Sequence, residues 1–285
     1  MRSCKAGISK LLPLLAVHFV AASPILIRDV PYSHGLCRQG IYNGEWSPLT
    51  SKPHGNGTYE CSSSYSYIGT WYQGLRQGGG ATTFTNGDVH IGHYLNDKRN
   101  GHGVMTWRSG RKYVGDYLND RRHGKGEMTF PNGDKYTGDW NNGRRLGHGL
   151  YLFTNGNRYK GDYVNGVKQG VGQFWWTAGQ HAGDKYVGQF RRDRRHGYGQ
   201  YFFSNGNIYE GNWVQGKQHG QGLLRYPNAN IMEGTWNRGL RDGVFIFTFP
   251  NGERHQATYV KGLRQGNWVK MDPVPPRLNV LRNGN

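Results

Sequence analysis

The stretch "YVGDYLNDRRHGKGEMTFPNGDK" (residues 113–135) is followed directly by "YTGDWNNGRRLGHGLYLFTNGNR" (residues 136–158). Glycines, aromatic residues and basic residues return to the same places, so the two stretches are copies of one 23-residue unit. Further copies begin at Tyr42, Tyr67, His90, Tyr159, Tyr186, Tyr209, Met232 and His255. A fixed period over most of a chain predicts an array in which each unit buries its apolar face against its neighbours.

Alternation within the unit predicts two strands. Tyr113 and Tyr117 fall on one face of a first strand, and Met128 and Phe130 fall on one face of a second. The Asn-Gly dipeptide at 132–133 then predicts a two-residue type I′ turn, in which both residues have positive φ. We therefore expect an all-β protein: an elongated, single-layer antiparallel β-meander built from stacked hairpins.

The columns of the repeat support one apolar face. The fifth residue is aromatic in unit after unit, at Trp71, Tyr94, Tyr117, Trp140, Tyr163, Phe190, Trp213 and Trp236. This column is interpreted as the packed face of the sheet or as a partner-binding face. The fourth residue, such as Asp116 or Asp139, suits the solvent side. Copies of Gly115 and Gly124 are expected to let backbone and rings approach closely.

These residues carry a family resemblance. The pattern YxGxW…G…HGxGxxxxxNG resembles the MORN repeat, and it is complete at Tyr209, Gly211, Trp213, Gly216, His219, Gly220 and Gly222. The resemblance covers residues 42 to about 268. It implies a non-enzymatic scaffold that links membranes, cytoskeleton or ciliary structures to partner proteins, and it implies binding to acidic phospholipid as one option.

The chain divides into four parts. Residues 1–22 resemble a signal peptide, 23–41 form a lead-in, 42–268 form the repeat array, and 269–285 form a proline-rich tail. Open edge strands pair readily with other chains, so homo-oligomerisation through the array ends is a further expectation.

Charge is concentrated in one column of the unit. The chain has 36 Lys and Arg against 18 Asp and Glu. We place the tenth residue of the unit in the loop between its two strands, where it forms a row of cations. This candidate polyanion-binding or lipid-binding edge comprises Arg76, Arg99, Arg122, Arg145, Lys168, Arg191, Arg192, Arg194, Arg195, Lys217, Arg241 and Arg264. The alternatives are a solubility device and, more weakly, a single-stranded nucleic-acid binder.

The N-terminal region bears on the compartment. Basic residues precede the apolar run "LLPLLAVHFVAA", as in a secretory signal peptide. Cleavage would leave Cys37 and Cys61 as a candidate disulfide, and Asn56 begins an N-glycosylation sequon in an expected loop. Because Cys37 precedes the first unit, a bridge is expected to require this segment to fold back. We expect entry into the secretory pathway, and the alternative is a cytoplasmic location at membrane, cytoskeleton or cilium. The leading functional hypothesis is a scaffold that binds a protein partner or an acidic membrane surface, and the alternative is a secreted or luminal adhesive or binding module with the same fold.

The sequence predicts no catalytic residue, cofactor or metal. His123, His196 and His219 occupy one position in separate units, so copies in neighbouring units lie about 10 Å apart and distant copies lie much further apart. Zinc ligands must lie within about 2.1 Å of one ion, which this spacing forbids. A role in supporting turns is expected instead.

Overall fold

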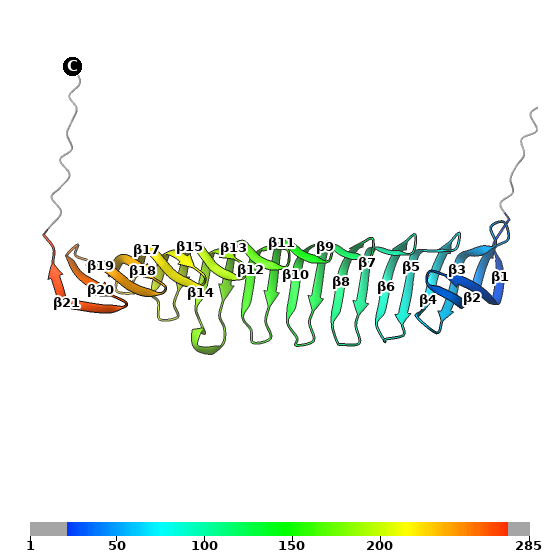
Figure 1. Cartoon of the computed structure of the whole chain (residues 1–285), viewed down its shortest axis with the longest axis horizontal. Coiled ribbons are helices and arrows are strands. Elements are labelled where there is room, and N and C mark those ends of the chain that lie inside the picture. Colours follow the sequence, from blue (N-terminus) through cyan, green and yellow to red (C-terminus); the bar gives the residue numbers. More distant parts are fainter. Residues whose placement is uncertain (1–21, 273–285) are drawn as a thin grey trace, which may run out of the picture.

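A single sheet runs through the part of the chain that the structure describes. The computed structural model describes residues 22–272. Its 21 strands form one sheet, in which each strand pairs antiparallel with those before and after it in the chain. Figure 1 shows the resulting elongated, twisted meander. The expected fold class is therefore confirmed. Most of the signal-peptide-like segment and of the proline-rich tail lies outside the described residues.

The elements follow the repeat. The strands are β1 (Ile25–His34), β2 (Cys37–Ser47), β3 (Lys52–Cys61), β4 (Tyr65–Tyr72), β5 (Leu75–Phe84), β6 (Val89–Leu95), β7 (Lys98–Thr106), β8 (Lys112–Leu118), β9 (Arg121–Thr129), β10 (Lys135–Asn141), β11 (Arg144–Leu152), β12 (Arg158–Val164), β13 (Val167–Trp175), β14 (Lys185–Arg191), β15 (Arg194–Phe202), β16 (Ile208–Val214), β17 (Lys217–Arg225), β18 (Ile231–Asn237), β19 (Leu240–Thr248), β20 (Arg254–Val260) and β21 (Leu263–Lys270). A short 3-10 helix, η1 (Gly179–His181), occupies the inserted residues of the longest unit.

Two kinds of turn alternate along the sheet. Within a unit, Asn142 and Gly143 both have positive φ, as a two-residue type I′ turn requires. Between units, the expected type I′ turn at 132–133 is wrong, because only Gly133 has positive φ. There Gly133 N–H donates to the Phe130 carbonyl (2.9 Å), which fits a type I turn followed by a left-handed glycine. Pro131 sets the φ that the first central residue of a type I turn needs.

The aromatic face is packed by tyrosines that lie flat on glycines. Tyr113 is fully buried, and its hydroxyl donates to the Asp116 carbonyl (3.0 Å). A Cβ on Gly126 would stand 2.3 Å from the Tyr113 hydroxyl. The Tyr113 ring meets the rings of Tyr117 and Trp140 edge-on, with centroids 5.3 and 5.4 Å away. The same contacts recur in successive units and form a continuous ladder of rings.

The opposite face, which we call the open face, carries the fourth residue of each unit. This residue does more than face solvent, because the second strand of the unit contains a bulge. Asp139 accepts a hydrogen bond from the bulged His148 N–H (2.9 Å), and Asp162 does the same for Val171 (2.9 Å). Gly124 belongs to this bulge, with φ of 60°, rather than to the aromatic face.

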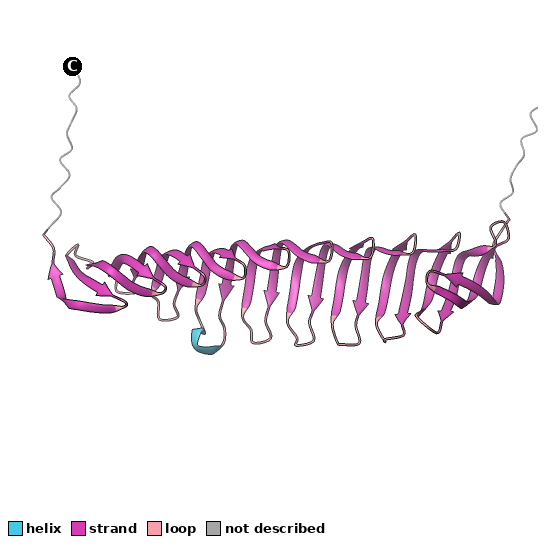
Figure 2. Ribbon diagram, viewed as in Figure 1, coloured by secondary structure: helices cyan, strands magenta, loops and turns pink. Residues whose placement is uncertain are grey.

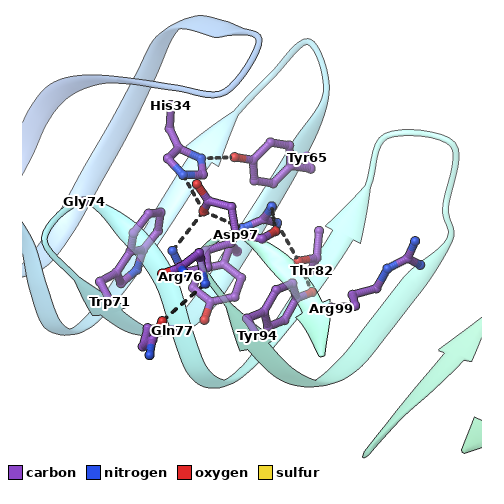
Figure 3. Close-up of polar contacts among 12 residues, drawn as sticks. His34, Tyr65, Trp71, Gly74, Arg76, Gln77, Thr82, Tyr94, Asp97 and Arg99 are labelled. Atoms are coloured by element: carbon purple, nitrogen blue, oxygen red, sulfur yellow. Dashed lines mark hydrogen bonds and ion pairs between the residues drawn. The ribbon is translucent and has the colours of Figure 1, made fainter. Parts of the chain in front are cut away.

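The lead-in covers the start of the aromatic ladder. Figure 3 shows His34 of β1 between Tyr65 and Asp97. The His34 ring is 5% exposed; its Nε2 lies 2.8 Å from Asp97 Oδ1 and its Nδ1 lies 2.5 Å from the Tyr65 hydroxyl. Asp97 also accepts a bond from Arg76 N–H (2.9 Å). Residues 25–34 therefore reach a side chain of β4 and one in the turn that follows β6, although their backbone pairs only with β2.

Both cysteines lie in adjacent strands. Cys37 is the first residue of β2 and Cys61 is the last residue of β3. The structure joins them by a disulfide with a Cα–Cα distance of 6.2 Å. The segment before the first unit does not need to fold back for this, because β2 already extends through it.

Candidate binding surfaces

The tenth-position cations lie on the aromatic face. Arg122 is the second residue of β9 and pairs with Tyr117 across the two-residue turn. Its guanidinium carbon is 4.4 Å from the centre of the Trp140 ring, and its Nη2 donates to the Gly143 carbonyl (2.8 Å). Its expected position in a loop is therefore wrong. Arg122 instead connects its own unit to the turn of the next unit.

The same arrangement recurs along the column. Arg99 donates to the Asp120 carbonyl (3.0 Å) and Arg195 to the Gly216 carbonyl (2.8 Å). Cation–ring contacts within 6 Å are made by Arg76, Arg99, Arg122, Arg145, Lys168, Arg195 and Arg241. Burial lowers the pKa of Arg122, Lys168 and Arg195. Arg264, in the last strand, is exposed.

The fifth-position aromatic residues are core residues. Trp71, Tyr94, Tyr117, Trp140, Tyr163, Phe190, Trp213 and Trp236 are each at most 6% exposed. A partner that approached this face would therefore meet the edges of a packed ladder rather than free rings. This geometry gives the column a structural role.

Other predicted cations do project into solvent. Arg191, Arg192 and Arg194 surround the turn between β14 and β15 and are exposed. With His196 and Gln215 they line a cavity of about 530 Å³. Lys217, at the start of β17, is also exposed. We call Arg191, Arg192, Arg194 and Lys217 the turn cluster.

Sequence reasoning found only part of a related set of residues, because it included Arg194 and Lys217 but not Lys98, Arg121 and Arg144. The ninth residue of the unit is exposed on the open face at Lys98, Arg121, Arg144, Arg194 and Lys217. Alternation could have located these cations, because the ninth residue points away from the tenth. The exposed basic edge is thus one residue earlier in the unit than the predicted one.

Asn56, the candidate glycosylation site, is in β3 and not in the expected loop. Its side chain is exposed on the open face, and its backbone N–H donates to Glu45 Oε1 (3.1 Å). Among residues 22–272, no group of three His, Cys, Asp or Glu side chains is arranged to hold a metal ion. The same region contains no helix long and apolar enough to span a membrane.

One continuous sheet made of repeated hairpins, each in contact with its neighbours, defines a repeat scaffold. The family model for the MORN repeat matches nine segments, at residues 51–64, 67–89, 90–110, 113–135, 136–158, 159–181, 186–208, 209–231 and 233–254. The chain therefore belongs to the MORN-repeat family. The comparison with curated proteins gave no match.

Similarity to solved structures is weak. The TCP domain of SAS-4 (dCPAP) of Drosophila Melanogaster, in complex with a proline-rich motif of Ana2 (dSTIL), is 12% identical, with 57% of this chain and 87% of that chain covered and a TM-score of 0.30. The wild-type TCP10 domain of Danio rerio CPAP is 12% identical, with 75% and 96% covered and a TM-score of 0.29. These TM-scores are too low to support any inference about this chain.

Proposed function

We propose that the array is a non-enzymatic scaffold whose turn cluster binds an acidic surface, either of a membrane or of a partner protein. The observation that carries the proposal is the exposed group Arg191, Arg192 and Arg194 around one cavity. Several cations at one turn of a rigid sheet concentrate positive potential at one place on the surface. The partly buried cations of the tenth position contribute to the array and not to this surface.

The test replaces Arg191, Arg192, Arg194 and Lys217 with glutamine. Each cation beside an anionic membrane is worth about 1 kcal/mol, so the quadruple variant should bind phosphatidylserine vesicles roughly a thousandfold more weakly. Co-sedimentation at low and physiological salt measures this, with neutral vesicles as a control. A variant that binds like the wild type would contradict the proposal for membranes and leave an acidic protein as the partner to seek by crosslinking.

A second proposal concerns the compartment, and the Cys37–Cys61 disulfide favours it. Disulfides persist in oxidising compartments, so we propose that the chain enters the secretory pathway and serves there as a binding module. Protein from its own cells should then begin near Ser23, carry a glycan on Asn56 and migrate differently after reduction. A retained Met1 or Arg2, found by N-terminal sequencing, would contradict secretion.

A further inference from the structure

A second row of cations lies on the open face, near the turns between units. It begins at Lys112 and follows the register of the sheet across β8 to β14. The successive partners are Lys112, Thr129, Lys135, Leu152, Arg158, Trp175 and Lys185. A cation therefore stands on every second strand, about 10 Å from the next. We call Lys112, Lys135, Arg158 and Lys185 the loop-edge row.

These charges are uncompensated on their own face. Within residues 22–272, none of the four forms an ion pair with a carboxylate, and no acidic residue stands between them in the row. Elsewhere on the open face, Lys125 does form an ion pair, with Asp139. Lys112, Lys135 and Arg158 are exposed, and Lys185 is half-buried. The row thus presents a line of positive charge to solvent.

Part of the row is held in place by aromatic rings. The Arg158 guanidinium carbon is 4.6 Å from the centre of the Trp175 ring, and Lys185 Nζ is 5.5 Å from the same ring. Lys185 Nζ is also 5.6 Å from the Phe202 ring. Contacts of this kind restrict the long side chains before any ligand arrives, which lowers the entropy lost on binding.

We propose that the loop-edge row binds a linear acidic polysaccharide that carries carboxylate or sulfate groups at regular intervals. Basic patches of this kind bind heparin or nucleic acid, and two features favour the polysaccharide. First, a nucleobase needs an uncovered aromatic face on which to stack, whereas Arg158 and Lys185 both lie over Trp175. Second, a disulfide belongs to compartments outside the cytosol.

The shape of the sheet argues for a chain and against a bilayer at this row. The strands turn progressively along the array, as Figure 2 shows, so the row winds about the long axis. A planar membrane would touch only a short part of such a row. A polymer that follows the twist would reach all four cations.

The test compares two quadruple variants of the full chain with equal loss of charge. One replaces Lys112, Lys135, Arg158 and Lys185 with glutamine; the other replaces the turn cluster in the same way. We expect the first to bind heparin roughly a thousandfold more weakly than the wild type, by analogy with about 1 kcal/mol for each of four cations beside an anionic surface, and the second to change little. Neutral dextran should bind none of the three proteins, and heparin binding by the wild type should weaken steeply with salt.

A gain of negative charge provides a second test that removes no cation. Leu152 lies between Lys135 and Arg158 and is exposed, so Leu152→Glu should weaken heparin binding severalfold without changing the circular dichroism spectrum. Equal losses in both quadruple variants would overturn the proposal in favour of net charge. A loop-edge variant that keeps heparin binding but loses a single-stranded oligonucleotide or phosphatidylserine vesicles would overturn it in favour of that ligand. Vesicle binding tests the scaffold proposal separately. A loss of vesicle binding in the turn-cluster variant alone would support that proposal without bearing on the loop-edge row.

Discussion

Tyr113 and the equivalent tyrosines are buried, although residues 22–272 form one sheet with no second layer of secondary structure. The reason is the glycine at the third position and its cross-strand partner, here Gly115 and Gly126. Because these residues have no side chains, the Tyr113 ring can lie directly against the backbone of both strands. Its hydroxyl then donates to the Asp116 carbonyl. The repeated glycines therefore decide where the core is.

Substitution of one of these glycines by alanine tests the packing of the Tyr113 ring directly. Gly126→Ala would place a methyl group 2.3 Å from the Tyr113 hydroxyl and 2.6 Å from its ring, so we expect a loss of about 1–3 kcal/mol in the free energy of unfolding. Gly79→Ala is the matched control, because nothing lies within 4 Å of its Cβ. It should change stability by less than about 0.5 kcal/mol. Denaturant titration measures both, and similar effects would contradict the packing described.

The buried tyrosines also make a prediction about alkaline pH. Burial raises the pKa of Tyr117 and Tyr136 from 10.0 to about 12. A raised pKa means that the unfolded chain loses the proton first, so stability is complete below pH 10 and falls as pH rises toward 12. Each such tyrosine should contribute a slope of about 1.4 kcal/mol per pH unit in that range. The tyrosinate absorbance of the buried tyrosines should appear together with unfolding; a native protein whose entire tyrosinate signal develops near pH 10 would contradict the burial.

At the scale of elements, the period and alternation of the sequence predict the hairpins. The position of the two-residue turn is predicted wrongly, because a second Asn-Gly dipeptide was not considered. Asn142-Gly143 is also an Asn-Gly dipeptide, and it forms the two-residue turn. Once that turn is fixed, the fifth and tenth residues must be cross-strand partners, as Tyr117 and Arg122 are. The tenth-position cation then belongs to the aromatic face. Its burial was thus accessible from sequence, given the correct turn.

The contacts of the lead-in could not be predicted from the sequence in the same way. His34 and Asp97 are 63 residues apart, and the lead-in has no copy elsewhere in the chain that could reveal its packing. Burial would raise the pKa of Asp97, but the bond with His34 and the Arg76 N–H outweigh it, so this pKa is lowered. Such a network depends on how β1 lies over the aromatic ladder, which periodicity does not encode.

Two neighbouring arginines of β11 allow the contributions of the two faces of the sheet to stability to be compared. Arg145 lies 5.0 Å from the Tyr163 ring and donates to the Gly166 carbonyl, so Arg145→Gln should cost about 1–3 kcal/mol of stability. Arg144 is exposed on the open face, and Arg144→Gln should stay within about 0.5 kcal/mol of the wild type. Thermal unfolding of the two variants provides the comparison. Equal midpoints would mean that the cation–ring contacts do not stabilise the array.

At the scale of the whole molecule, the protein behaves as a one-dimensional object. Strands contact the strands beside them along the sheet, and the disulfide and the His34 network add links only at the N-terminal end. Stability in such arrays is approximately a sum of unit and interface terms. The two outer strands, β1 and β21, each leave one edge unpaired within the described residues. Length can therefore change without changing the structure of a unit.

Removal of one complete unit tests this additivity. Deletion of residues 136–158 joins Lys135 to Tyr159, which restores the register that Lys135 has with Tyr136 in the intact chain. The shortened protein should keep its β-sheet circular dichroism and should lose about 10 Å of length in X-ray scattering, since two strands are removed. Deletion of residues 136–147 is the control, because it removes β10 and part of β11 and so reverses the direction of what remains. We expect that protein to aggregate or unfold, whereas a full-unit deletion that unfolds as well would show that the array is one cooperative core and not a sum of neighbouring units.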